Sequence, residues 1–350
     1  GLGAGALLTG TLGGRQAAPA GAGDATSTAA AESTEVLLTS IPEPTQGQIA
    51  ELVPSETPSP EPTVQPTPTE IPTLAATPIG GGGGQIAFAS EQTGLPQIFL
   101  IDLNGRNFTQ LTTIPDGACQ PAWSPDGERL LFTSPCREKR DDYANSAIFI
   151  MNPDGSAVAP LISLVGGVYD ADWSQEGIVF TWLDGMEALW VADANGSNQR
   201  RLSIGRARDS QPSWSPGGDK LAIMNTSRAG SPTIFWIFGD GTFNGSNPDQ
   251  VTRDQIASQP AWSPLGDLVA YVSNQNIWVV PWEGVGFGAA RITDKGPNEG
   301  PSWSPDGQWI AFETWRDAAN HDIYIMTGNG GQPTRITSHT ASEFHPAWRP

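Results

Sequence analysis

Six tryptophans recur at nearly regular intervals, and this repetition constrains the fold more than any other feature of the chain. Successive anchors lie 50, 41, 48, 41 and 45 residues apart. Most of them stand in the motif P-(A/S)-W-S-P. A period of about 40 to 50 residues is typical of proteins built from repeated supersecondary units, such as propellers. The anchors are Trp123, Trp173, Trp214, Trp262, Trp303 and Trp348.

Each anchor is followed by a turn and by short apolar runs. In the first repeat these are the turn SPDG at Ser124–Gly127, LLFTS from Leu130 and AIFIM from Ala147, before the more polar segment AVAPLI. Proline presets φ in such turns, and glycine takes the positive φ that closes a hairpin. Runs that are apolar on both faces indicate strands buried between neighbouring sheets. Each repeat therefore predicts one four-stranded antiparallel blade.

The two ends of the repeat region complete each other. The first three runs, QIAFAS at Gln85–Ser90, QIFLID at Gln97–Asp102 and FTQLT at Phe108–Thr112, lack a tryptophan strand. The last run, EFHPAW at Glu343–Trp348, is a tryptophan strand without a blade. The sequence thus predicts an all-β fold over 85–350, a six-bladed β-propeller closed when the C-terminal strand pairs with the N-terminal blade. Closure removes free sheet edges.

The residues before the repeats have a different composition. Residues 15–84 contain many Thr-Pro, Ser-Pro and Glu-Pro steps, no aromatic residue, and eight acidic residues against Arg15. Such a segment predicts a disordered, extended tether, which suits a stalk or an ordinary interdomain linker. Residues 1–14 are uncharged and too short to span a bilayer. We interpret them as the remnant of a signal or transmembrane segment, with a plain Gly/Ala-rich start as the alternative.

The charge balance excludes one class of partner. Eighteen Lys and Arg face 37 Asp and Glu, for a net charge of −19. Nucleic acid binding needs clustered cations, so no nucleic acid is expected. The acidic surface also disfavours anionic lipids, which leaves the N-terminus as the route to membrane anchorage. We expect another protein or a peptide as partner.

A candidate binding site follows from the position of the tryptophan strands. These strands are expected to be innermost, so the residue three before each tryptophan should face the channel or its mouth. Five of the six residues at this position are polar, and the sixth is Gly300. A ligand site and a solvated channel holding water both fit this pattern. The candidates are Gln120, Asp170, Gln211, Gln259 and His345, with the neighbouring Glu299.

Two loops on the same face form a candidate interface. The loop CREKRDDYANS at Cys136–Ser146 has dense mixed charge, and WRDAANHD at Trp315–Asp322 carries aromatic and charged groups. Long loops often carry function, although ordinary solvated loops have the same composition. We expect Tyr143, Trp315, Arg316 and His321 to be exposed, which would suit a protein or peptide interface. The candidates are Arg137, Tyr143, Trp315, Arg316 and His321.

The two cysteines are predicted to lie close together. Cys119 begins a tryptophan strand and Cys136 ends the next strand of the same hairpin, so the two lie nearly opposite each other. This spacing predicts a disulfide, with two free thiols as the alternative. A disulfide would indicate an oxidising compartment outside the cytoplasm.

The motif P-x-W-S-P-D-G, followed by (I/L)-A-F and I-(Y/F)-I-M, resembles the TolB-type propeller repeat over Gln85–Pro350. The resemblance implies the propeller fold. It is compatible with periplasmic scaffolds, with sensor domains and with the gating propellers of prolyl-oligopeptidase-like hydrolases. The tether stands where true TolB proteins carry a small α/β domain, so the partners of the Tol system are not transferred to this chain.

No catalytic motif accompanies the repeats. The sequence has no G-x-S-x-G, no H-E-x-x-H and no P-loop, and its three histidines lack the spacing of helical metal ligands. We therefore expect no enzymatic activity, no metal and no cofactor. The sequence favours an extracytoplasmic scaffold or sensor propeller on a stalk that binds a protein or ligand. The alternative is a substrate-gating or accessory domain of a hydrolase or lyase.

Overall fold

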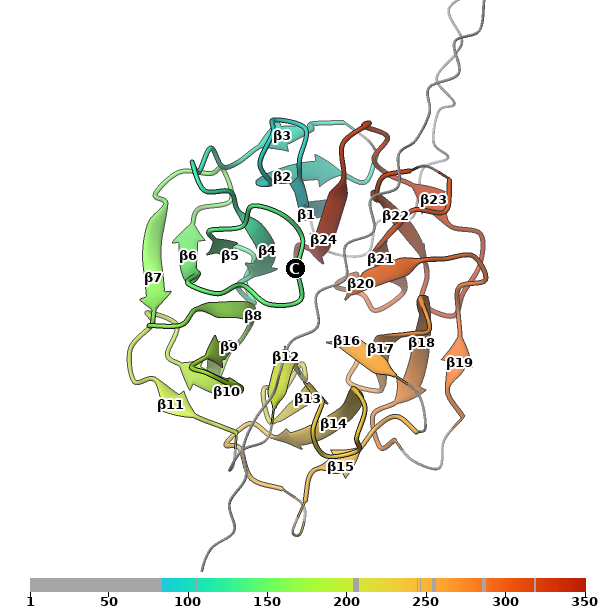
Figure 1. Ribbon diagram of the computed structural model, residues 1–350. Helices are drawn as coiled ribbons and strands as arrows, with labels where there is room; N and C mark the ends of the chain where they lie inside the picture. The colour runs from blue at the N-terminus through green and yellow to red at the C-terminus, as the bar shows by residue number, and fades with distance from the viewer. Residues whose placement is uncertain are drawn as a thin grey trace, which may run out of the picture. The chain divides into compact units, whose positions relative to one another are not determined.

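The computed structural model describes residues 84–350 except 105, 204–207, 244, 246, 254–255, 285–287 and 318. The predictions for residues 1–14 and for nearly all of 15–84 lie outside the described residues. Every regular element of the described range is a β-strand, so no helix there is long and apolar enough to cross a membrane. The strands form six four-stranded sheets that are arranged as a ring (Figure 1).

The two inner strands of each blade are five to seven residues long. The innermost strands, in ring order, are β24 (Glu343–Trp348), β4 (Cys119–Trp123), β8 (Val168–Ser174), β12 (Asp209–Trp214), β16 (Ala257–Trp262) and β20 (Asn298–Trp303). The second strands are β1 (Gln85–Ser90), β5 (Leu130–Ser134), β9 (Gly177–Leu183), β13 (Lys220–Asn225), β17 (Leu268–Ser273) and β21 (Trp309–Thr314).

The third strands have five or six residues, whereas the outermost strand has only two residues in every sheet except that of β7. The third strands are β2 (Gln97–Asp102), β6 (Ala147–Met151), β10 (Glu187–Ala192), β14 (Thr233–Phe238), β18 (Asn276–Pro281) and β22 (Asp322–Thr327). The outermost strands are β3 (Thr109–Gln110), β7 (Ala159–Ser163), β11 (Arg200–Arg201), β15 (Asp249–Gln250), β19 (Ala290–Arg291) and β23 (Thr334–Arg335).

The ring closes as predicted. Strand β24 pairs antiparallel with β1, so that Ile86 lies opposite Trp348 and Ser90 lies opposite Glu343. The last and first parts of the repeat region thus form one blade, here called blade 1, and blades 2 to 6 follow in chain order. The prediction of an all-β, six-bladed propeller is confirmed.

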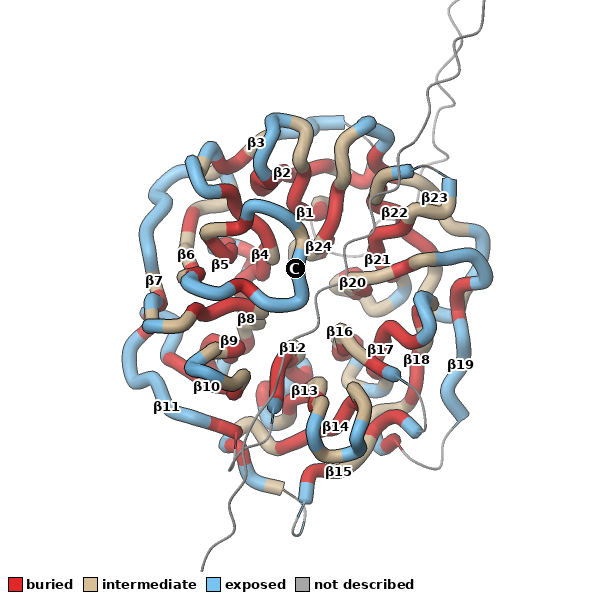
Figure 2. The backbone as a smooth tube through the Cα atoms, viewed as in Figure 1, coloured by how far each residue is buried: buried red, intermediate tan, exposed pale blue. Residues whose placement is uncertain are grey.

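The core lies between adjacent blades. Strands of blade 1 and blade 6 share one apolar cluster, in which Phe88 and Phe99 meet Ile323, Ile325 and Trp348. Figure 2 shows the pattern, with buried inner strands and exposed outermost strands. Five of the six anchor tryptophans are buried, whereas Trp173 is half-buried. The tryptophans therefore act mainly as packing groups between blades.

Each blade has a bulge between its innermost and second strands. The register of the pair shifts there, as between Glu299 and Ser302 of β20. At each bulge one residue of the innermost strand has a φ between 50° and 57°. A positive φ costs energy for residues other than glycine, and a bulge re-aims the side chain. The residues are Gln120, Asp170, Gln211, Gln259, Gly300 and His345, here called the channel ring.

Candidate functional site

The channel ring lines a cavity of about 180 Å³ at the face where the innermost strands begin. This face is here called the lid face, and the opposite one the turn face. The five polar residues predicted for the channel mouth all border the cavity, whereas Glu299 does not. The structure therefore brings five of the six predicted residues to one cavity. Their role as ligand-binding groups stays a prediction.

Ring residues link neighbouring blades through hydrogen bonds. The side-chain carbonyl of Gln120 accepts from the amide of Asp170 at 3.1 Å, and the Asp170 carboxylate is hydrogen bonded to the backbone of Gln211. Gln211 accepts from the amide of Gln259 at 2.7 Å, and Gln259 accepts from the amide of Gly300 at 2.7 Å. We call these contacts the blade straps. Through these contacts, the side-chain oxygens of Gln120, Asp170, Gln211 and Gln259 already accept hydrogen bonds from the protein itself.

The straps stop at Gly300, because glycine has no side chain to reach the next blade. The following ring residue is His345, whose Nδ1 atom is buried and has no hydrogen-bond partner among the described residues. Desolvation lowers the pKa of His345 to about 3, so the imidazole is neutral at physiological pH. Among the described residues, the sector from Gly300 to Gln120 therefore shows no blade strap.

A charged segment of blade 2 covers part of the cavity. Residues 137–142, here called the lid, follow strand β5, and Arg140 and Asp141 of the lid border the cavity. The structure joins Cys136, just before the lid, to Cys119 in a disulfide. Just after the lid, Tyr143 is buried against Tyr169, with ring centroids 5.9 Å apart.

The expectation that Tyr143 is exposed is wrong. Its side chain is 4% exposed, and its hydroxyl accepts a hydrogen bond from the backbone amide of Arg140. Burial of the aromatic ring in the core is energetically favourable, and the hydroxyl has a hydrogen-bond partner there. Tyr143 therefore anchors the lid instead of presenting a contact to a partner.

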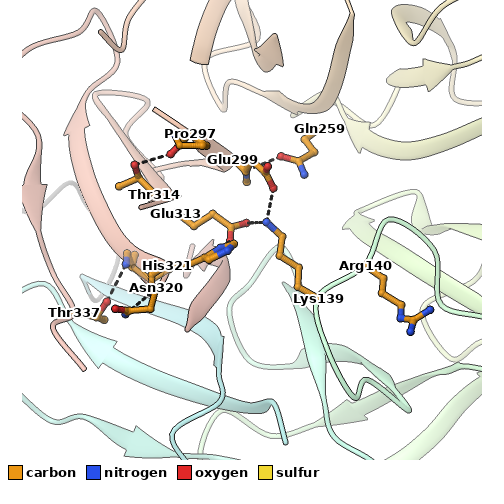
Figure 3. A network of polar contacts seen from close by, with 12 residues as sticks. Lys139, Arg140, Gln259, Pro297, Glu299, Glu313, Thr314, Asn320, His321 and Thr337 are labelled. Carbon is orange, nitrogen blue, oxygen red and sulfur yellow. Dashed lines mark hydrogen bonds and ion pairs between the residues drawn. The ribbon is translucent and has the colours of Figure 1, made fainter. Parts of the chain in front are cut away.

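Lys139 fastens the lid to blade 6, across blade 1. Its ammonium lies 2.8 Å from a carboxylate oxygen of Glu313 and also pairs with Glu299 (Figure 3). The other oxygen of Glu313 lies 2.8 Å from Nδ1 of His321. Burial alone raises the pKa of Glu313, but Lys139 and His321 outweigh it and lower the pKa to about 2. The buried Glu313 is thus a carboxylate.

The other four predicted interface residues differ in exposure: one lies at the surface, and three lie partly buried beside Glu313 or Asn298. Arg137 is exposed and forms an ion pair of 2.7 Å with Asp116. Trp315 and His321 are half-buried, and their rings are tilted by 33° with centroids 3.8 Å apart. Arg316 is half-buried and donates to the side-chain oxygen of Asn298 at 2.9 Å. The expectation that Tyr143, Trp315, Arg316 and His321 are exposed is therefore wrong for all four, whereas Arg137 is exposed.

A second cavity of about 600 Å³ opens at the turn face. It is lined by the repeated W-S-P segments, such as Trp214, Ser215 and Pro216. Five prolines and Ala171 border both cavities, so they separate the two chambers along the channel. The prolines are Pro121, Pro212, Pro260, Pro301 and Pro346.

Metal ligation finds no support in this part of the chain. Within the described residues, no three His, Cys, Asp or Glu side chains lie close enough to hold a metal ion. The Lys139 ammonium occupies the centre of the acidic cluster, and a cation is therefore already present between Glu299 and Glu313.

Comparison with known proteins supports the resemblance of the repeats. No protein-family model matches the chain. A TolB homologue of Chlorobium luteolum is 31% identical over 157 residues, which are 44% of this chain and 34% of the relative. In the crystal structure of TolB from Acinetobacter baumannii, the matched part covers 77% of this chain and 68% of that one, with a TM-score of 0.65 and 20% identity. The propeller is similar to that of TolB.

The similarity has two limits. This chain spans about a third of the length of the curated TolB homologue that it matches. A shorter stretch of 83 residues is 34% identical to the uncharacterized peptidase YuxL of Bacillus subtilis, covering 21% of this chain and 11% of the peptidase. The comparisons therefore establish the TolB-like propeller fold, and they do not transfer the activity or partners of the whole relatives.

Sequence reasoning missed Lys139 and Glu313. Lys139 stands in a loop with several other charges, and its partners lie 160 and more positions away. Glu313 gave a clearer signal, because it is a carboxylate in the run IAFET, where other second strands of this TolB-like propeller have Thr133, Thr181 or Val272. A charged side chain in a strand buried on both faces needs a partner.

Proposed function

We propose that this protein is an extracytoplasmic scaffold or sensor propeller that binds a protein partner at its lid face. One observation carries the proposal: a charged segment of six residues covers part of the central cavity, and five of its six residues are exposed. Partner surfaces of propellers are often loops held on a rigid ring, because loops vary while the scaffold stays fixed.

Two further observations support an extracytoplasmic location. The disulfide between Cys119 and Cys136 suits an oxidising environment. The sequence similarity to TolB homologues, among them a Tol-Pal system protein of Anaeromyxobacter dehalogenans, suits the same assignment. We further propose that the residues before Gly84 serve as a stalk, which could tether the propeller to a membrane.

The test is capture of a partner from a native envelope extract by chemical crosslinking to the full chain. A variant replaces lid residues 137–142 with a Gly/Ser segment of equal length. A matched control replaces the turn 152–156, which follows β6 at the turn face. A partner captured by the wild type and the control, but lost by the lid variant, is the expected result. Equal capture by the lid variant would refute binding at this face.

As a second candidate, we propose an accessory role beside a hydrolase, which the 83-residue similarity to a peptidase favours. The channel would then filter substrates for a catalytic partner. The same crosslinking experiment separates the two candidates, since the captured protein would be a hydrolase and its peptidase activity would change on addition of the propeller.

A further inference from the structure

Among the six lid residues, only Lys139 has a side chain that is not exposed. Lys139 has a side chain that is only 18% exposed, whereas the other five lid residues are exposed. The ion pair of Arg137 with Asp116 joins side chains that are 72% and 56% exposed, and solvated pairs contribute little. Lys139 is therefore the side chain that decides whether the tip of the lid stays in place.

The two carboxylates and the aromatic ring that contact this ammonium belong to blade 6. Glu299 lies in β20, Glu313 lies in β21, and Trp315 follows β21. The ammonium of Lys139 lies 5.7 Å from the centre of the Trp315 ring, within the range of a cation–π contact. Blade 6 thus provides two carboxylates and an aromatic face, and blade 2 provides only the cation. A compact ammonium with three donors matches this arrangement.

Glu313 makes simple detachment of the lid unfavourable. Its side chain is completely buried, and His321 orients one of its oxygens from 2.8 Å. Withdrawal of Lys139 would leave a buried carboxylate without its main counterion, which is costly. Exchange of Lys139 for another ammonium keeps the buried charge compensated. The network therefore favours opening by replacement over spontaneous opening.

We propose that Glu299, Glu313 and Trp315 form a docking site for a lysine side chain of the protein partner, whose ammonium displaces Lys139 and releases the lid from the cavity. The chain's own lysine shows that this group fits the site. The net charge of −19 attracts basic partners over long range, which favours a lysine-rich surface. The partner in this inference rests on the proposed function, whereas the ammonium site is testable without it.

The experiment uses the full chain with Lys139→Ala and measures thermal unfolding with added n-butylammonium chloride. This ion has the same four-carbon ammonium as lysine. We expect a saturable rise of the melting temperature of about 3 °C for the variant. Tetramethylammonium chloride at the same concentration has no N–H donor and should give no such rise. Equal effects of the two salts, or a larger effect of calcium chloride, would overturn the proposal.

Lys220→Ala is the matched control. Lys220 also lies over a tryptophan ring, 5.1 Å from the centre of Trp282, and pairs with Asp219. The side chain of Asp219 is 60% exposed, so water can replace the lysine there. We expect no rescue by n-butylammonium in this variant. A rise equal to that of Lys139→Ala would mean that the effect is unspecific and would overturn the proposal.

A second measurement serves if Lys139→Ala fails to fold. Wild-type protein is digested briefly with trypsin, and cleavage after Arg137 and Arg140 of the lid is followed by mass spectrometry. We expect n-butylammonium to accelerate lid cleavage severalfold and tetramethylammonium to leave it unchanged. An unchanged rate with both salts would refute the exchange.

The two proposals fail separately. Rescue and lid release by n-butylammonium, together with partner capture by the lid variant, would refute the lid face as the partner surface while supporting the ammonium site. Absence of rescue, together with loss of partner capture by the lid variant, would refute the lysine site while supporting the proposed function.

Discussion

Two regions of the channel ring hold the blades together in different ways. From blade 2 to blade 6, the ring residue of one blade bonds to the backbone of the next, from Gln120 through Gln259 to Gly300. In the sector that contains His345, the first and last strands of the repeat region pair, and Lys139 crosses from blade 2 to blade 6. The strap recurs at the other junctions, whereas this sector lacks it and instead carries the contact of Lys139 with distant residues of blade 6.

The largest effect is expected from removal of 343–350. The deletion takes away β24, with Phe344 and Trp348 from the core, and exposes the edge of β1. We expect the melting temperature to fall by more than about 15 °C, or cooperative unfolding to be lost. Deletion of residues 56–63 from the predicted linker is the control and should leave the transition unchanged. A truncated chain that melts with the intact one would contradict this account of closure.

Next in size is the loss of the Lys139 contact. Lys139→Ala leaves Glu313 buried without its ammonium partner, and we expect a loss of about 3 kcal/mol in the free energy of unfolding. Glu313→Gln in the same chain should recover most of this loss, because the buried charge is then gone. Urea unfolding of the two single variants and the double variant measures the coupling. Additive single effects would show that the two residues do not form a functional pair.

A smaller effect is expected from one blade strap. Gln259→Gly removes the acceptor of the Gly300 amide but tolerates the φ of 51°, and we expect a loss of about 1 kcal/mol in unfolding free energy. Gln275→Gly is the matched control, because Gln275 has a φ of 62° and is exposed. The control should be neutral or slightly stabilising in urea unfolding. Identical losses at both positions would mean that the strap contributes nothing.

The smallest effect concerns pH. Asp170 borders the cavity, yet desolvation raises the pKa of its carboxyl from 3.8 to about 7. The folded state therefore binds more protons than the unfolded state between these values, and stability falls as pH rises from about 4 to 7. We expect Asp170→Asn to reduce this fall by about 2 °C in melting temperature between pH 5 and 7.5. Asparagine also tolerates a positive φ. Parallel curves for the two proteins would refute this ionisation.

Most of the fold could be predicted from the sequence, because the information is repeated. The turn after Trp123 and the two apolar runs that follow recur in register, and the incomplete ends match each other. The channel ring could also be predicted, since its position relative to the tryptophan is constant. The left-handed φ of Gln120 or Gln211 could not, because glutamine carries no signal for a bulge.

The lid could be predicted as a loop but not as a cover. Its position depends on Lys139 pairing with Glu313, and no local pattern connects residues in two blades separated by blade 1. The burial of Tyr143 was missed for the same reason, since its partner Tyr169 belongs to blade 3. Unique contacts between distant segments are not encoded by periodicity.

The closing blade also places the start of the first strand and the C-terminus at the same face of the propeller. Gln85 lies at the turn face, where its backbone carbonyl accepts from the amide of Arg349 at 2.9 Å. Arg349 in turn donates to the carbonyl of Gly127 in the first S-P-D-G turn. The chain therefore enters and leaves the propeller side by side, on the face opposite the lid. An affinity tag, a dye or a solid support attached at Pro350 would leave the lid free for titration.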